Sequence, residues 1–486
     1  MTSPPPQSTR YSSIPRHSSA AWYLASTAVG SATPLLTLPI ITRVLEPEEF
    51  GAWVLAYAYG VFISALSNFG MVLVYERSFF ATRDAAESAA LLWTTLVFVA
   101  GLLTSALVCT WIWRETLSAW MMQTTSYSSL LFWTSCAVGV SNLKIYFLTY
   151  FRNRGEARNY AIFSIDEVVL GAIGSVLLVA WFRVGPEGLA WGPLAASTIV
   201  LSFLVAHIVR RLPVRLGAAQ LKASLWLGLP LLPRVFLAVF GQVFDKWLVG
   251  LVASTGGVAG YAIGQRLAYV AFTISTTLEN VFQPRTYRLM FDGGESGGKD
   301  IGTMLTPFAY ATVGAALAVG LAAEEVIAFL APESYAGAVA VTTVLVLHFA
   351  ILFFGKQPQL LYAKKTGVLS ALSSLGVLFN AAAMWFFAMR YGAVGAAIGT
   401  AVSGFLMTSL SVRVSQRYYR IEYERKMLML LYAYLVLALA VTYLLQAAAE
   451  YPVRFSAKFV FLAAYLWIGH VFRWWAPLIR YARRGG

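Results

Sequence analysis

Charged residues are scarce in this sequence, and their scarcity indicates whether water or lipid surrounds the chain. Only 12% of the 486 residues are Asp, Glu, Lys or Arg, whereas 59% are hydrophobic. An ordinary soluble domain carries about 25% charged residues. Lipid rather than water therefore surrounds most of the chain.

Groups for metal or redox chemistry are also few. The two cysteines, Cys109 and Cys136, both lie in apolar runs, so they form neither a disulfide framework nor a metal cluster. A Gly-x-x-x-x-Gly-Lys-[Ser/Thr] phosphate-binding loop is absent, which leaves ATP without an evident site. We expect no metal, no cofactor and no catalytic residue; the driving force could be the membrane potential, a proton gradient or a sodium gradient.

We expect no cleavable signal peptide, because no short apolar core followed by a small-residue cleavage site occurs in the first residues of this sequence. Residues 1–17, with three consecutive prolines, are predicted to be a disordered cytosolic tail.

Long apolar runs are what the sequence has instead. A membrane-spanning helix needs about 20 mostly apolar residues, and the sequence predicts an all-α, polytopic membrane protein. Fourteen segments fit, at about residues 18–42, 51–75, 88–113, 127–150, 159–182, 188–209, 223–250, 257–283, 301–323, 336–355, 366–389, 392–412, 427–447 and 455–472.

The net charge of +14 would suit a nucleic-acid binder, but its distribution indicates membrane topology. With the N-terminus inside, 26 of the 36 Lys and Arg residues fall in cytosolic segments, 6 fall outside and 4 lie within apolar runs. Such an asymmetry places both termini in the cytosol, and we expect no nucleic-acid partner. The longest outer loops, 114–126 and 324–335, are too short for a separate domain, so the function must lie within the helix bundle.

Glycine-containing segments recur at a nearly constant offset, which indicates an internal repeat. Gly51 and Gly260 are 209 residues apart, and residues 185–192 match residues 392–399 at an offset of 207. Parallel six-helix repeats enclose a central site that opens alternately to each side, as in a transporter. The predicted domains are an N-lobe at 18–210, a basic linker at 211–222, a C-lobe at 223–415, two additional helices at 416–472 and a basic cytosolic tail at 473–486.

Several segments resemble a known family. They are LPIITRVLEPEEFG at 38–51, FDKWLVG at 244–250, VAGYAI at 258–263, ESYAGA at 333–338, and Asn380 with YGAVGAAIGT at 391–400. Over residues 18–420 the chain resembles the polysaccharide transporter branch of the multidrug, oligosaccharidyl-lipid and polysaccharide exporter superfamily, which includes O-antigen and lipid II flippases. Where that family commonly has Asp-Arg, this chain has Asp245-Lys246, which keeps the charge but loses a planar bidentate donor.

The resemblance implies a flippase rather than an enzyme. Its cargo would be a polyprenyl-diphosphate-linked glycan, such as an O-antigen or exopolysaccharide repeat unit, moved from the inner to the outer leaflet of the bacterial cytoplasmic membrane. Its partners would be membrane lipids and the glycosyltransferases and polymerase of the same pathway. Two alternatives are a cation-coupled drug exporter of the superfamily and a membrane glycan polymerase or ligase; the latter typically needs a large outer loop, which is missing here.

Ionisable residues within apolar runs are the candidate site, because each costs about 2.5 to 3.5 kcal/mol at membrane depth. Arg234, about eleven residues into the predicted span 223–250, and Arg266 are expected to face one cavity and bind the diphosphate. Around Arg266, polar side chains recur every three or four residues as a stripe that suits sugar hydroxyls, although hydrogen bonds between helices would need the same residues. The other members of the stripe are Tyr269, Thr273, Thr277 and Asn280.

Five more charged residues complete the candidates. Lys144 could meet the diphosphate in the inner leaflet or extend its ammonium to the interface. Asp166 and Glu167 are predicted either to pair with Lys144 or to couple transport to a cation. Asp245 and Lys246 are predicted to form a structural ion pair.

Overall fold

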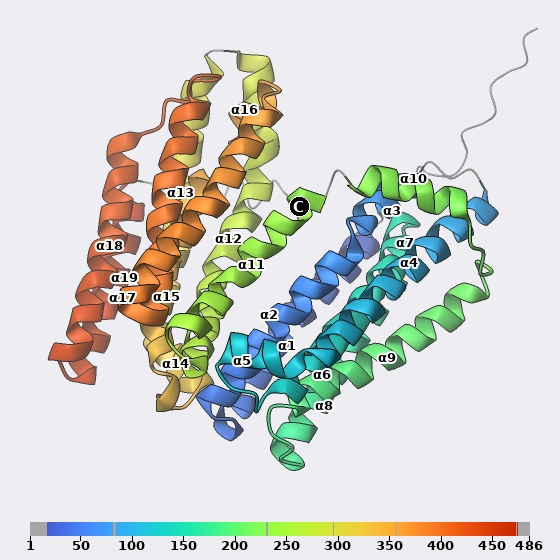
Figure 1. Cartoon of the computed structure of the whole chain (residues 1–486). Coiled ribbons are helices and arrows are strands. Elements are labelled where there is room, and N and C mark those ends of the chain that lie inside the picture. The colour runs from blue at the N-terminus through green and yellow to red at the C-terminus, as the bar shows by residue number, and fades with distance from the viewer. Residues whose placement is uncertain are drawn as a thin grey trace, which may run out of the picture. The chain divides into compact units, whose positions relative to one another are not determined.

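The chain is all-α over the residues that the computed structural model describes, which are 17–80, 84–229, 232–294, 296–355, 357–472 and 474. The predicted N-terminal tail, except for His17, and the predicted basic tail 473–486, except for Trp474, lie outside these residues. Figure 1 shows the helices in chain order. They are α1 (His17–Val44), α2 (Pro47–Asn68), α3 (Met71–Phe79), α4 (Ala85–Ile112), α5 (Arg114–Met122), α6 (Ser128–Leu143), α7 (Ile145–Asn153), α8 (Ala157–Val176), η1 (Leu177–Trp181), α9 (Gly188–Val209), α10 (Ala218–Gly228), α11 (Leu232–Val252), α12 (Thr255–Gly293), α13 (Gly297–Leu321), α14 (Ala323–Leu330), η3 (Glu333–Tyr335), α15 (Gly337–Ile351), η4 (Leu352–Phe354), α16 (Pro358–Tyr362), α17 (Thr366–Ser415), α18 (Arg425–Ala448) and α19 (Tyr451–Val471).

The predicted class, a polytopic α-helical membrane protein, is confirmed. Eleven helices in the described part of the chain are long and apolar enough to cross a membrane. One of them, α17, has 50 residues and is interrupted at Gly392, whose φ of 55° is not helical. The helices α12 and α19 also occupy predicted spans. The total of fourteen spans stays a prediction.

The structure differs from the predicted spans at residues 223–250. This segment contains the end of α10 and most of α11, two separate helices. Pro233 is the second residue of α11, a position in the first turn where the missing N–H of proline costs no helical hydrogen bond. Arg234 is therefore the third residue of α11, near a helix start, and not eleven residues into a helix.

Two predicted outer loops also contain short helices. The segment 114–126 forms α5, and the segment 324–335 forms most of α14 and the turn η3.

The chain divides into two compact units. The first contains Met1–Val44, Tyr59–Ser118 and Ser126–Val239, and the second contains Leu45–Ala58, Ala119–Thr125 and Phe240–Gly486. The helices α2, α5 and α11 contribute residues to both units. The domain boundaries drawn from the sequence stay a prediction.

Aromatic side chains form the core of the first unit. Tyr75, Tyr146 and Phe147 are fully buried, and the rings of Tyr75 and Tyr146 are 5.9 Å apart in an edge-to-face arrangement. The indole of Trp93 donates a hydrogen bond of 3.0 Å to the carbonyl of Leu212, beyond α9. Such pairs add stabilisation beyond the area they bury, and they fasten α3, α4 and α7 to the end of α9.

In the first unit, α8 and α9 form a closely packed hairpin. A Cβ built on Gly174 would lie 3.0 Å from the Cα of Gly192, and one built on Gly188 would lie 2.8 Å from a methyl carbon of Val179. Small residues four apart let helix backbones approach closely within a membrane. Glycine at 188 and 192 therefore sets the distance between these helices.

In the second unit, α17 folds back on itself at Gly392 into a second hairpin. A Cβ on Gly399 would lie 2.5 Å from the Cα of Met384, and one on Gly395 would lie 2.6 Å from the carbonyl carbon of Phe387. The hydroxyl of Ser403 donates a 2.6 Å hydrogen bond to the side-chain oxygen of Asn380. The two legs of α17 are thus antiparallel neighbours.

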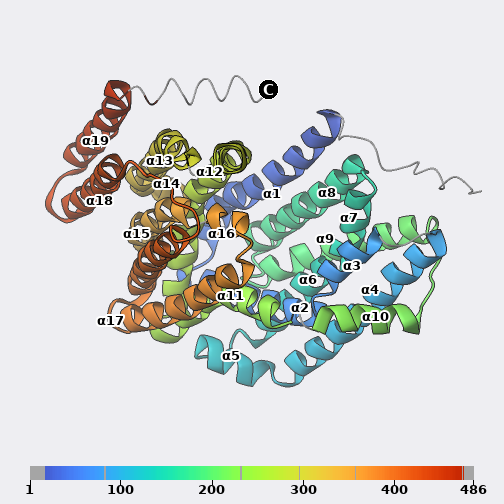
Figure 2. The ribbon, with the colours of Figure 1, turned by 90° about the horizontal axis from the view of Figure 1, so that it is seen from above.

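The two C-terminal helices pack beside α13 in the second unit (Figure 2). The rings of Tyr310 and Tyr465 stack with their centroids 4.7 Å apart, and the hydroxyl of Tyr465 donates to the carbonyl of Tyr310 at 2.6 Å. Near α14, the ammonium of Lys458 contacts Glu324 at 2.5 Å and Glu325 at 2.7 Å. A partly buried ion cluster and a tyrosine pair therefore attach α19 to the helices that precede it.

Candidate functional site

The residues that were predicted to form a polar stripe all belong to α12. Tyr269, Thr273 and Thr277 are exposed on this helix. The hydroxyl of Thr273 donates to the carbonyl of Tyr269 at 3.1 Å, and that of Thr277 donates to the carbonyl of Thr273 at 2.8 Å. These bonds stay within one helix, so the alternative interpretation, hydrogen bonding between helices, does not explain the two threonines. Their oxygens remain able to accept a hydrogen bond from a ligand.

Arg266 is the cation of this stripe. Its side chain is half-buried, and within the described residues it forms no ion pair with a carboxylate. Its electrostatic neighbour is the phenol of Tyr57, in the middle of α2 and in the same unit. An arginine without a carboxylate partner at membrane depth is costly, and a bound anion would offset that cost.

Two other predicted members of the site cannot be placed by their side chains. The backbone of Arg234 lies in α11 and that of Asn280 in α12, but both side chains lie outside the described part of the structure. Arg234 belongs to the first unit and Arg266 to the second. That both arginines bind one diphosphate stays a prediction.

Asp245 and Lys246 are brought together, with further partners. The ammonium of Lys246 is 2.9 Å from the carboxylate of Asp245, and the amide of Gln265 donates to that carboxylate at 2.6 Å. Asp245 is buried, with 7% of its surface exposed. A carboxylate with two donors is satisfied in place, and the arrangement supports the predicted structural role.

Lys144 and Glu167 also form a buried ion pair, in the first unit. Their side chains are only 11% and 9% exposed, and the second oxygen of Glu167 accepts a 2.6 Å hydrogen bond from the hydroxyl of Ser197. Lys144 occupies the junction between α6 and α7, with Glu167 on α8 and Ser197 on α9. Of the two alternatives for Glu167, the structure contains the pairing with Lys144. A substrate phosphate would reach this lysine only by competing with Glu167.

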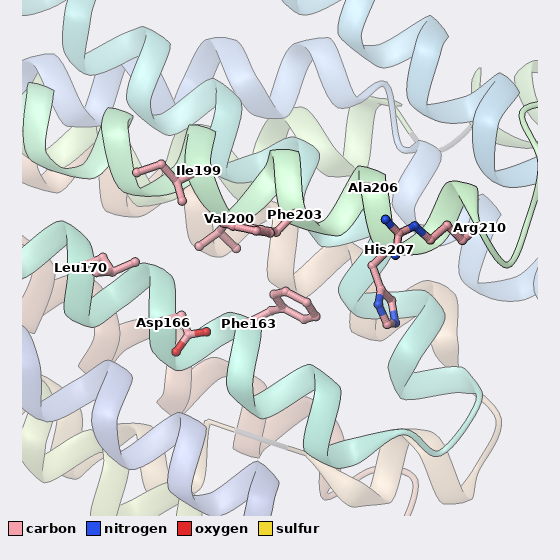
Figure 3. Close-up of a pocket in the computed structure, with 9 residues that line it drawn as sticks. All are labelled: Phe163, Asp166, Leu170, Ile199, Val200, Phe203, Ala206, His207 and Arg210. Carbon is pink, nitrogen blue, oxygen red and sulfur yellow. The ribbon is translucent and has the colours of Figure 1, made fainter.

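Asp166, adjacent to Glu167, has a different environment. It is exposed, and no hydrogen bond or ion pair in the described structure involves it. It lines a pocket between α8 and α9 together with His207 and Arg210 (Figure 3). A role in cation coupling stays a prediction for Asp166.

Sequence reasoning missed His207 and Arg210 as pocket residues, because Arg210 was counted as one of several cytosolic charges. It also missed the cluster of Glu324, Glu325 and Lys458. One signal was available: Arg454 and Lys458 lie four residues apart and so share a helix face. Arg454 contacts Glu324 at 2.9 Å.

Within the described residues, no group of three or more His, Cys, Asp or Glu side chains could hold a metal ion.

Comparisons with known proteins identify the family and the fold of the chain. The family described as "Polysaccharide biosynthesis protein" matches residues 40–340, more than half of the chain. Among solved structures, the lipid II flippase MurJ in an inward closed conformation is similar, with a TM-score of 0.69 and 11% identity over 93% of this chain and 99% of that one.

Two conformations of a multidrug resistance MATE family transporter of the MOP superfamily are also similar. The inward-facing one has a TM-score of 0.58 at 16% identity, covering 81% of this chain and 97% of that one. The outward-facing one has 0.54 at 14%, covering 82% and 94%. At such identities the structures show a common fold. Among curated proteins, none matches the chain.

Proposed function

The chain belongs to the polysaccharide biosynthesis protein family, and from this premise we propose that it is a flippase for a polyprenyl-diphosphate-linked oligosaccharide. The cargo, an O-antigen, exopolysaccharide or similar repeat unit, moves from the inner to the outer leaflet of a bacterial cytoplasmic membrane by alternating access. Both termini are cytosolic in this proposal. The fold shared with a lipid II flippase supports it.

Arg266 is the observation that carries the proposal. A diphosphate cannot cross hydrocarbon without compensation, because an unpaired buried charge costs many kcal/mol. Arginine stays protonated when buried, and its fork of donors suits phosphate oxygens. The exposed stripe of Tyr269, Thr273 and Thr277 continues from it along α12, where hydroxyls and an aromatic face suit sugars. Arg234 and Asn280 are further proposed substrate contacts. Lys144 joins them only where a substrate phosphate replaces Glu167 as its partner.

The test replaces Arg266 by Ala and by Lys in cells that depend on this protein for surface glycan. Arg266→Ala should lower the export of glycan at least tenfold at unchanged protein level, and Arg266→Lys should restore part of it, because a lysine keeps the charge without the fork. Arg288→Ala is the matched control, since Arg288 is an exposed arginine of the same helix. Normal surface glycan in the Arg266→Ala cells would overturn the assignment of Arg266.

A cation-coupled exporter of small molecules is the second candidate function, favoured by the fold shared with MATE transporters. Proteoliposomes separate the two functions. A flippase moves undecaprenyl-diphosphate-linked N-acetylglucosamine between leaflets, where a lectin added outside detects it. An exporter instead moves a cationic dye against its gradient and leaves the lipid-linked sugar in place.

A further inference from the structure

The pocket between α8 and α9 lies wholly within the first unit and has a volume of about 590 Å³. Binding pockets for small ligands have volumes of about 300 to 1,000 Å³. In Figure 3, Phe163 and Asp166 line it from α8, and Phe203, His207 and Arg210 line it from α9. The pocket is therefore large enough for a ligand, and two helices build it.

Asp166 is the residue that needs an explanation. It lies nine residues beyond Ala157, the first residue of α8, or about 14 Å along the helix axis. If α8 begins at the edge of the hydrocarbon core, which is about 30 Å thick, the carboxylate lies well inside that core. An exposed carboxylate there is expensive unless it has a partner, and the described residues provide none. A ligand that donates hydrogen bonds would supply one.

Arg210 provides the opposite charge at the other end of the pocket. It directly follows the last residue of α9, is exposed, and has no ion pair within the described part of the chain. Its neighbour Arg211 differs, because Arg211 contacts the carboxylate of Glu156 at 2.8 Å. One of two adjacent arginines thus lacks a protein partner and lines the pocket.

The pocket wall between these two charges is apolar and aromatic. Phe203 is 65% exposed, and Phe163 lies opposite it on α8 (Figure 3). The ring of His207 packs 6.2 Å from that of Phe163 and continues the wall toward Arg210. Aromatic faces between a carboxylate and a guanidinium suit a sugar ring, whose hydroxyls donate to the carboxylate while an attached phosphate accepts from the guanidinium.

The spacing of the two charges fits such a head group. The Ser197 to Glu167 hydrogen bond and the Arg211 to Glu156 ion pair show that α8 and α9 are antiparallel neighbours. Asp166 and Arg210 then lie about 15 to 20 Å apart along the helices, less the reach of the two side chains. One or two sugar rings with a diphosphate can bridge that separation.

We propose that this pocket is a loading site for the sugar-diphosphate head of the carried lipid. Arg210 binds the diphosphate at the end of α9 that is expected to face the cytosol, and Asp166 accepts hydrogen bonds from sugar hydroxyls beyond Phe163 and Phe203. The lipid tail stays in the bilayer. This proposal rests on the proposed function. It adds an earlier binding step at a site in the first unit that does not include Arg266.

An anionic phospholipid fits the same pocket less well. Its phosphate would suit Arg210, but its acyl chain would cover Asp166 and bury a carboxylate without a hydrogen-bond donor, which is costly. A bound cation at Asp166 would leave Arg210 unexplained.

Binding to the purified full-length protein in phosphatidylcholine nanodiscs tests the proposal. The probe is N-acetylglucosamine linked through diphosphate to a farnesyl chain, and the dissociation constant is measured by the change in intrinsic tryptophan fluorescence. Asp166→Asn and Arg210→Ala should each weaken binding at least tenfold. Arg211→Ala, the matched control, should change it by less than twofold. Asp166→Asn is nearly isosteric, and thermal unfolding checks that each variant is folded.

The competing molecules distinguish the possible ligands. Inorganic pyrophosphate should compete with the probe in the wild type and lose this effect in Arg210→Ala. If phosphatidylglycerol displaces the probe equally from the wild type and Asp166→Asn, the pocket is a phospholipid site and the proposal is wrong. Unchanged probe binding in both variants also overturns the proposal. So does an effect of Asp166→Asn on probe binding that is seen only when sodium or protons are added, because Asp166 would then bind a cation and not the sugar.

The proposed function can fail separately. If the wild type moves no lipid-linked sugar in proteoliposomes, the proposed function is wrong whatever binds here. If the wild type and both variants move it at one rate and bind the probe equally, only the loading site is wrong.

Discussion

Two helical hairpins can be compared, α8 with α9 in the first unit and the two legs of α17 in the second. Their glycine contacts are similar, but the polar side chains between their helices differ. Gly188 approaches η1 and Gly192 approaches α8, as Gly395 and Gly399 approach the first leg of α17. Each hairpin also turns at a glycine with a left-handed φ, 84° at Gly185 and 55° at Gly392. These pairs are all 207 residues apart, which supports the predicted repeat, although the superposition of whole halves stays a prediction.

The polar side chains do not follow this repeat. In the first unit, Ser197 donates to Glu167, which also pairs with Lys144. The residue 207 positions after Ser197 is Gly404, and a Cβ there would collide with the ring of His348. The second hairpin is instead joined by the neutral pair Asn380 and Ser403. Similar glycine contacts thus occur beside a buried ion pair in one hairpin and beside a neutral pair in the other.

The largest expected effect comes from breaking the charged hairpin. Glu167→Ala leaves Lys144 buried without its partner, and the free energy of unfolding should fall by about 3 to 5 kcal/mol. The double variant Lys144→Met with Glu167→Leu should recover most of this loss, since well-packed apolar residues often replace a buried ion pair without cost. Unfolding by SDS in mixed micelles measures both. A double variant as unstable as the single one would show that the ion pair is indispensable to this hairpin.

Glycine substitutions should affect both hairpins alike. Gly192→Ala and Gly399→Ala force a Cβ into opposing backbone and should each lower the free energy of unfolding by about 1 to 3 kcal/mol. Gly101→Ala in α4 is the control, because nothing lies within 4 Å of its added Cβ; it should raise stability by up to about 1 kcal/mol. Thermal unfolding in detergent gives the ranking. If only one of the two substitutions, Gly192→Ala or Gly399→Ala, lowered stability, the two hairpins would not be packed in the same way.

The smallest effect is expected in the neutral hairpin. Asn380→Ala and Ser403→Ala remove one neutral hydrogen bond between helix legs, and a double-mutant cycle should give a coupling of about 0.6 kcal/mol. The same SDS unfolding assay applies. A coupling free energy between Asn380 and Ser403 as large as that between Lys144 and Glu167 would show that the neutral pair matters as much as the ion pair.

The class of the protein and the positions of its hairpins could be predicted from the sequence. Apolar runs and the asymmetric charge indicated a polytopic helical protein, and the matched glycines at 185–192 and 392–399 lie where both hairpins turn and pack. The prediction for Arg234 depended on one long helix over 223–250, and the break before α11 removed its basis. A break between two helices is hard to detect from hydropathy when apolar residues continue on both sides of it.

The composition by itself determined that the chain lies in a membrane, because lipid requires apolar helices. The spacing of glycines determined where helices pack closely, because close contact requires small residues. The tertiary structure decided which charges are paired. Asp166 and Glu167 are adjacent, yet Glu167 meets Lys144 and Asp166 faces a pocket; Arg211 meets Glu156, whereas Arg210 lines that pocket. Successive residues of a helix point about 100° apart, so the neighbouring helices, and not the sequence, select the partner of each.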